Sequence, residues 1–380
     1  MIDTEPLLAT MLEGRRERRP LPPYAPMTND AIQALLDGWF ATHVPGARVG
    51  GIARLGGGAS KEQFRFTVEG AGAPQHMVLR MDPLEGITET SRRREHELLR
   101  AVAGVVPVPD ALYLDADASH FPQPAIIMAL VPGTPKPSGV GLSVTGLGTV
   151  LGDPLRGLIR PQYLDLLARI HGFDWRSADL PSFGRPLDDA KQPTRWLIGF
   201  WKELLEQDVV AREPVIRLAT QWLEASIPDC PDPVLVHGDF RTGNYLFDET
   251  SGQVTAVLDW EMAYIGDFHA DLCWLLQPVF GTRIDGHFRV SDIFDGEADF
   301  LAAYEAASGN RVNASTLHYF RIFNNWKSYI LVSVLGMRAA RSRHNHQDVL
   351  LTFLAATGPM FVAELARLLA APVVVEGAGA

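Results

Sequence analysis

The segment that most constrains this chain runs from Val234 to Leu276. Its alternation of apolar runs and polar breaks predicts three short strands, over residues 234–236, 245–247 and 254–258. A polar loop after the first strand holds Asp239 and Asn244, five residues apart, and the third strand ends at Asp259. Two carboxylates and one amide oxygen are therefore expected where neighbouring strands end.

These three side chains suit metal-assisted phosphoryl transfer. In that chemistry one Asp positions the incoming hydroxyl, while an Asn and a second Asp hold Mg²⁺ on the phosphates of a nucleotide. The pattern predicts Asp239 for the first role and Asn244 and Asp259 for the second. The alternative is a pair of turn-forming side chains that bind no ligand.

Composition narrows the class of protein. The 380 residues are 47% hydrophobic and 21% charged, as in ordinary globular proteins with a sizeable core. A formal net charge of −11 argues against nucleic acid as a partner, because phosphate backbones need a basic face. Two cysteines without a ligand spacing and no secretory signal favour the cytoplasm. The longest apolar stretch, residues 349–363, is too short to span a membrane and is expected to be a buried helix pair. A monomer or homodimer is expected.

Three regions are expected along the chain. Residues 1–28, rich in Pro, Arg and Glu, predict a loosely held arm. Residues 29–131 predict a lobe with one helix after the capping residue Thr28, a second helix over residues 91–102 and about five strands. Residues 132–380 predict a largely helical lobe that begins with an irregular insertion at 133–160 and a helix starting at Pro161. The expected fold class is α+β with two lobes, an antiparallel sheet lobe and a helical lobe.

The first lobe contains candidate nucleotide contacts. A strand, a glycine-rich turn at residues 56–58 and a second strand let backbone N–H groups approach phosphates, with the Ser60 hydroxyl as a further donor. A plain tight hairpin would need the same glycines. Arg80 on the third strand and Glu95 on the next helix predict an ion pair that positions phosphates, and a solvated helix face is the alternative. The backbone of Met128 to Leu130, before the hinge at residues 130–133, is where an adenine would bind.

The run HGDFRTGN, followed by LDWE and GDFHADLCWLL, resembles the aminoglycoside phosphotransferase family, whose members share the protein-kinase architecture. The resemblance covers residues 49–276 and is most specific over 236–276. It implies an ATP- or GTP-dependent kinase that uses Mg²⁺. It also implies that Asp239 is catalytic, that Asn244 and Asp259 bind the metal, and that Ser60, Arg80 and Glu95 contact or position the phosphates. Arg80 departs from the Lys of protein kinases.

The sequence also gives expectations for three further residues of the motif. His237 has no second His or Cys at ligand spacing and is predicted to pack and hydrogen-bond within the loop. The resemblance gives Asp271 a structural role at the backbone of the catalytic loop. Arg241 is expected either to contact a transferred phosphate or to point outward, and the sequence leaves both alternatives open.

The acceptor is the least determined part. Residues 301–380 contain seven Lys and Arg against four Asp and Glu, a poor wall for a polycationic acceptor. An apolar or anionic hydroxylated metabolite is therefore expected, unless these cations only face solvent. The chain also resembles the kinase-like domain fused to acyl-CoA dehydrogenases, which makes a hydroxyacyl compound conceivable. Two other readings are an aminoglycoside-resistance kinase and a nucleotide-binding pseudokinase without turnover.

Overall fold

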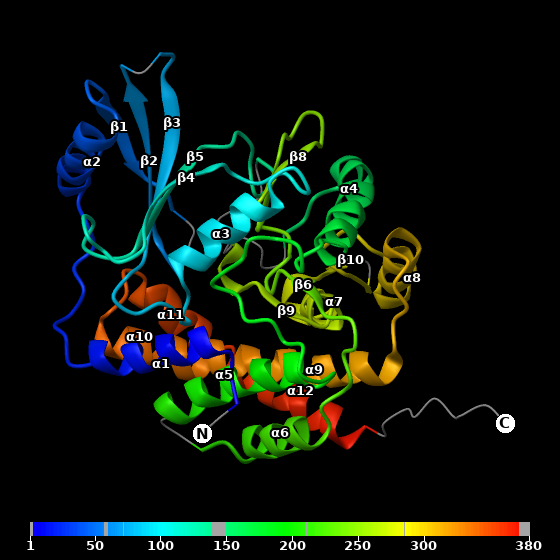
Figure 1. Cartoon of the computed structure of the whole chain (residues 1–380). Coiled ribbons are helices and arrows are strands. Elements are labelled where there is room, and N and C mark those ends of the chain that lie inside the picture. Colours follow the sequence, from blue (N-terminus) through cyan, green and yellow to red (C-terminus); the bar gives the residue numbers. More distant parts are fainter. Residues whose placement is uncertain are drawn as a thin grey trace.

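The chain folds into two lobes (Figure 1). The computed structural model describes residues 3–56, 60–70, 72–138, 149–209, 212–284 and 286–371. The first lobe is built on one antiparallel sheet and the second is mainly helical, so the expected α+β, two-lobed fold is confirmed.

The sheet of the first lobe has five antiparallel strands in the order β1-β2-β3-β5-β4. They are β1 (Arg48–Arg54), β2 (Glu62–Glu69), β3 (Gln75–Met81), β5 (Ala125–Ala129) and β4 (Ala111–Asp115). The alternating side chains Phe64, Phe66 and Val68 of β2 are buried in a separate small core. Helix α2 (Asn29–His43) covers this face with Ile32 and Phe40. Its start is fixed by the Thr28 hydroxyl, which accepts a hydrogen bond from the Ala31 N–H, as the sequence predicted.

Helix α3 (Arg92–Val102) crosses the other side of the first lobe and reaches the catalytic region (Figure 1). The Ser91 hydroxyl caps it by accepting a hydrogen bond from the Arg94 N–H. Leu98, Leu99 and Val102 bury one face of this helix in the main core, while Glu95 is buried on the side of the sheet. The predicted helix is therefore confirmed, and its buried acid lies where the ion pair requires it.

The second lobe contains the remaining elements. Its α-helices are α4 (Asp153–His171), α5 (Gln192–Asp208), α6 (Pro214–Ala225), α7 (His269–Leu275), α8 (Glu297–Ser308), α9 (Ala314–Tyr329), α10 (Met337–Ser342), α11 (Asp348–Ala355) and α12 (Gly358–Ala370). A π-helical segment, Ile330–Gly336, continues α9, and short 3₁₀ turns lie at Trp260–Met262 and Pro278–Phe280. Its strands pair as β6 (Val234–Val236) with β9 (Tyr264–Gly266), β7 (Tyr245–Phe247) with β8 (Val254–Val257), and β10 (Thr282–Ile284) with β11 (His287–Arg289).

The sequence-based expectations for the start of helix α4 and for the insertion before it are wrong. Helix α4 begins at Asp153 and not at Pro161, which lies inside it. The start at Asp153 is possible because Pro154 occupies a first-turn position, where no backbone N–H is needed. The predicted insertion at 133–160 is therefore partly helical, and its residues 139–148 lie outside the described residues.

The expected loose arm is also different. Residues Pro6–Arg18 form helix α1, which buries Leu12 and Arg15 and lies along α5 (Figure 1). Arg15 contacts Glu89 of the first lobe and Asp208 of α5, so charge pairing rather than apolar periodicity holds this segment. An amphipathic pattern is absent from the helix, which explains why the sequence did not predict it.

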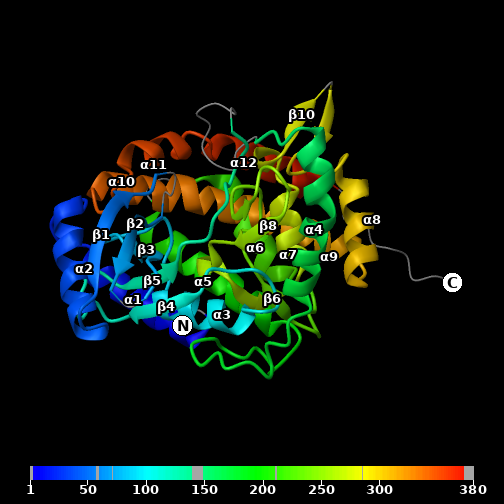
Figure 2. The same ribbon diagram turned by 90° about the horizontal axis from the view of Figure 1, so that it is seen from above.

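Residues Val349–Ala370 form the predicted helix pair, α11 and α12, which lie near one another in Figure 2. By length and composition this segment could cross a membrane, which is weak evidence on its own. The prediction that the pair is buried is wrong, since only 22% of its most apolar window lies inside the protein.

Candidate functional site

Strand pairing brings the three predicted catalytic and metal-binding residues together. The loop after β6 carries Asp239 and leads into β7, which pairs with β8. The Leu258 N–H donates to the Asn244 carbonyl over 2.8 Å, so Asp259 follows directly beside Asn244. The residues that are five and fifteen positions apart along the chain thus meet at one edge of a short hairpin.

The Asp239 carboxylate is held by three donors. The Trp274 indole N–H and the Arg241 Nε lie 2.7 and 2.9 Å from its Oδ1, and the Asn244 amide donates to Oδ2 over 2.6 Å. Its side chain remains 17% exposed. Because Oδ2 has one lone pair beyond the Asn244 contact, it can accept the proton of a substrate hydroxyl. Arg241 therefore neither points outward nor stands free for a phosphate, but binds Asp239.

Asn244 and Asp259 present oxygen atoms suited to a hard cation. The Asn244 Nδ2 donates to both the carbonyl and the carboxylate of Asp239, which leaves the Oδ1 of Asn244 for a ligand. Asp259 has a left-handed backbone (φ 61°, ψ 51°), a conformation that Asp tolerates better than most residues. Its side chain is 32% exposed, and one oxygen pairs with Arg80 while the other remains. An amide oxygen and a carboxylate oxygen fit the ligand preference of Mg²⁺.

The backbone of the catalytic loop is fixed from below by Asp271 of α7. Its two carboxylate oxygens accept hydrogen bonds from the N–H groups of His237 and Gly238, each over 2.8 Å. Burial acts to raise the pKa of Asp271, but the His171 side chain and the loop donors outweigh it, so the pKa lies below its usual value. This geometry confirms the structural role predicted for Asp271.

His237 packs within the loop, as predicted. Burial lowers its pKa, so the ring is neutral. Its Nε2 lies 3.0 Å from the Leu258 carbonyl and its Nδ1 lies 3.3 Å from the Asp239 N–H, which places the proton on Nε2. The ring thereby links the two strand ends that carry Asp239 and Asp259.

The predicted ion pair between β3 and α3 is present. Arg80 Nε lies 3.4 Å from Glu95 Oε1, and both side chains are buried. Arg80 also contacts Asp259 and lies 3.0 Å from Glu261 Oε2. These carboxylates outweigh the burial that would lower the pKa of Arg80, so its pKa is raised. The guanidinium thus connects the first lobe to the residue predicted to bind the metal.

Sequence reasoning missed four members of this cluster, namely Glu261, Arg92, Lys61 and Asp82. Glu261 Oε2 accepts Arg80, Arg92 at 2.9 Å and Lys61 at 3.3 Å. Lys61 also lies 3.2 Å from Asp82. Burial acts to raise the pKa of Glu261, but the three cations hold it below its usual range. The only sequence signal was the acid of the DWE run, because its partners come from positions about 170 to 200 residues away.

Ser60, Met128 and Leu130 are less directly placed for a nucleotide. Ser60 helps to lower the pKa of Glu261, and the neighbouring residues 57–59 of the glycine turn lie outside the described residues. Met128 is paired in the sheet with both Val78 and Ala111. The Leu130 N–H donates to the His76 carbonyl over 2.9 Å. An adenine nitrogen that accepts a hydrogen bond from this N–H would therefore have to replace that bond.

The cations of the C-terminal region divide into two groups. Arg311, Arg321, Arg338 and Arg367 each pair with a carboxylate. Lys327, by contrast, is 4% exposed and lies at the catalytic loop, where its Nζ donates to the Gly238 carbonyl over 2.9 Å. The surface cations therefore say little about the acceptor, whereas Lys327 contacts the loop that carries Asp239.

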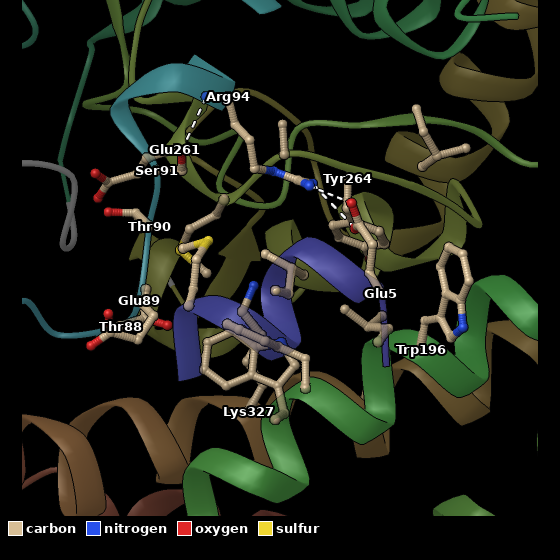
Figure 3. Close-up of a pocket in the computed structure, with 18 of the residues that line it drawn as sticks. Glu5, Thr88, Glu89, Thr90, Ser91, Arg94, Trp196, Glu261, Tyr264 and Lys327 are labelled. Carbon is tan, nitrogen blue, oxygen red and sulfur yellow. Dashed lines mark hydrogen bonds and ion pairs between the residues drawn. The ribbon is translucent and has the colours of Figure 1, made fainter. Parts of the chain in front are cut away.

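A pocket adjoins the catalytic loop beside Lys327 (Figure 3). Its walls come from α1, the start of α3, α5 and the segment that follows Asp259, and its volume is about 60 Å³. Its apolar lining includes Leu8, Met11, Leu197, Phe200, Trp201 and Met262. The sequence gives no signal that connects the aromatic residues of α5 with the site.

The charged side chains that line this pocket differ in whether they have an ionic partner. Glu5 pairs with Arg94, Glu89 pairs with Arg15 and Arg18, and Glu261 pairs with its three cations. Lys327 contacts a carbonyl and the rings of Trp274 and Trp201, at 4.1 and 5.5 Å, and no described carboxylate lies within ion-pair distance of its Nζ. Burial lowers the pKa of Lys327 to about 8, against the opposing effect of Asp239 and Asp271.

Comparison with solved structures shows the same architecture elsewhere. A Ralstonia eutropha protein described as a candidate aminoglycoside phosphotransferase superposes with a TM-score of 0.63 at 21% identity, covering 88% of this chain and 97% of that one. The aminoglycoside phosphotransferase APH(4)-Ia, solved with ADP and hygromycin B, gives 0.61 at 15% identity, with 90% and 100% covered. At these identities the similarity establishes the fold.

The sequence relatives are longer proteins. Mouse acyl-CoA dehydrogenase family member 10 is 28% identical over 266 residues, which are 69% of this chain and 23% of the relative. Human acyl-CoA dehydrogenase family member 11 is 27% identical over 272 residues, 69% of this chain and 32% of the relative. The chain thus spans about a quarter to a third of these relatives.

Residues 51–309 match the phosphotransferase enzyme family, and this range includes strands β2 to β5, most of β1, helix α3 and the whole loop from His237 to Asn244. With the fold above, the match shows that the chain belongs to the phosphotransferase enzyme family and has a two-lobed, protein-kinase-like fold.

Proposed function

We propose that the protein transfers the γ-phosphate of ATP or GTP to a hydroxyl group of a small metabolite that is not an aminoglycoside. The observation that carries this proposal is the arrangement of Asp239, Asn244 and Asp259 at adjoining strand ends. Phosphoryl transfer needs little covalent work from a protein, so positioning and charge neutralisation are what such a site must supply.

Each residue then has a defined part. Asp239 orients the acceptor hydroxyl through Oδ2 and takes its proton, while Trp274 and Arg241 hold the carboxylate in place. Asn244 and Asp259 would hold Mg²⁺, which supplies charge neutralisation on the phosphates. Arg80, kept in position by Glu95, contributes a further cation, and Ser60 contributes a hydroxyl. The hinge at Met128 and Leu130 remains our proposed edge for the base.

The acceptor class follows from the pocket beside the catalytic loop. An aminoglycoside carries several ammonium groups and would need carboxylates that are free to pair with it. The acids Glu5, Glu89 and Glu261 of this pocket are already paired with cations, and its one ammonium, Lys327, is not paired with a described carboxylate. These features support a hydroxylated acceptor with an apolar portion or an acidic group.

The test is a transfer assay with purified protein, Mg²⁺ and ATP or GTP. The acceptor panel contains aminoglycosides, hydroxy acids, hydroxyacyl-CoA esters and apolar alcohols, and Asp239→Asn is the control. We expect transfer to one of the last three classes and its loss in the variant, with nucleotide binding retained. Preferential transfer to an aminoglycoside would refute the acceptor class. Nucleotide binding without transfer to any compound would favour the pseudokinase interpretation.

A further inference from the structure

Helix α1 forms one wall of the pocket beside the catalytic loop. Glu5, Leu8 and Met11 line it, at a spacing of three residues that places them on one face of the helix. Figure 3 shows the α1 segment passing between Lys327 and the residues of α3 that lie opposite. This helix precedes residues 51–309, the range that matches the family, so this wall is not part of the shared family region.

The pocket is too small for an acceptor as it stands. Its volume of about 60 Å³ is well below that of usual small-ligand sites, which measure about 300 Å³ or more. One wall must therefore move if this pocket receives a substrate. The walls differ in how firmly apolar packing holds them.

Apolar packing fixes the other walls. Phe200 and Trp201 of α5 and Ala263 and Ile265 near β9 belong to the main core. Helix α1 contributes a single buried apolar side chain, Leu12, to that core. Segments with few buried apolar contacts open at lower free energy than core segments. Helix α1 is accordingly the wall that apolar packing holds least.

Ion pairs attach α1 to both lobes. Arg15 and Arg18 reach Glu89 of the first lobe, at 3.0 and 2.5 Å. Arg16 lies 2.5 Å from Glu203 of α5, and Arg19 lies 2.5 Å from Asp208 at the end of the same helix. Such contacts restore the closed position without requiring close apolar fit, since charges attract over longer distances than packed side chains do.

We propose that helix α1 is a movable wall of the acceptor pocket, and that Leu8 and Met11 help to decide the length of the acceptors that enter. This inference rests on the proposed function for the meaning of the pocket. The binding of a non-reactive apolar anion tests it separately, because that measurement needs neither nucleotide nor transfer. Octanoate is the probe, since its chain suits the aromatic lining and its carboxylate suits Lys327.

The first experiment fixes α1 in the closed position. Arg16→Cys and Glu203→Cys place two thiols where the ion pair now lies, and bismaleimidoethane joins them. The native Cys230 and Cys273 are buried and serve as a low background. Calorimetry should show octanoate binding to the full chain weakened about tenfold or more by the cross-link. The same double variant capped with N-ethylmaleimide should bind octanoate as the wild type does.

The second experiment changes the wall without restraining it. Leu8→Ala and Met11→Ala should shift the binding preference from octanoate towards dodecanoate, whereas Leu7→Ala, on the exposed side of the same helix, should leave it unchanged. Equal octanoate affinity with and without the cross-link would overturn the movable wall. An unchanged chain-length preference in both pocket variants, or no octanoate binding by the wild type, would overturn the assignment of the pocket. Octanoate binding that depends on α1, in a protein that transfers phosphate to nothing, would sustain the inference while refuting the proposed function.

Discussion

Replacing Glu261 by Gln removes one charge from the most highly connected carboxylate of the site. Its Oε2 accepts Arg80 at 3.0 Å and Arg92 at 2.9 Å, with Lys61 at 3.3 Å. Each hydrogen bond to a charged group contributes about 1 kcal/mol more than a neutral one, so the two guanidinium bonds alone account for about 2 kcal/mol. The cations keep Asp82, Glu95 and Asp259 as partners, which places the loss below the upper limit of about 5 kcal/mol for a broken buried pair.

We therefore expect Glu261→Gln to lower the free energy of unfolding by about 3 kcal/mol. Urea denaturation followed by fluorescence of the eight tryptophans measures this value. The matched control is Glu364→Gln, whose pair with Arg367 is exposed and should contribute no more than about 0.5 kcal/mol. If the two variants proved equally stable, Glu261 would not be the charge centre that joins the two lobes.

Three further predictions concern the catalytic loop and its neighbours. The pKa of Lys327 is about 8 when folded and about 10.4 when unfolded, so the unfolded chain binds more protons between these values and stability rises with pH. Relative to Lys327→Met, the wild type should gain up to roughly 3 kcal/mol of unfolding free energy between pH 7 and pH 10.5, and parallel pH profiles would contradict this. Asp271→Asn should lower the free energy of unfolding by about 3 kcal/mol in urea denaturation, because one acceptor for the loop N–H groups of His237 and Gly238 becomes a donor. A loss under about 1 kcal/mol would argue against the structural role of Asp271 at this loop. Asp259→Ala should abolish the effect of Mg²⁺ on nucleotide affinity in calorimetry, and an unchanged metal effect would remove Asp259 from the ligand set.

Local sequence predicted the parts of this protein whose geometry depends on neighbouring residues. The Thr28 cap, the alternation of Phe64 and Phe66, and the acids at strand ends all follow from backbone periodicity and turn chemistry. For the same reason the helix that starts at Pro161 was predicted wrongly, since a proline signals a first turn whether or not a helix has already begun.

The proposed catalytic and metal-binding residues could be predicted from the sequence because they lie within 21 residues of one another, from Asp239 to Asp259, beside two short paired strands. The contacts around these residues could not be predicted from the sequence. Glu261 meets Lys61, 200 positions earlier, and Lys327 meets Gly238, 89 positions earlier. Helix α1 has no amphipathic pattern, because charge pairs with both lobes hold it in place. The sequence thus determined which chemistry the chain carries, whereas the tertiary structure decided the pocket beside that chemistry, since only folding brings such distant charges within reach of one another.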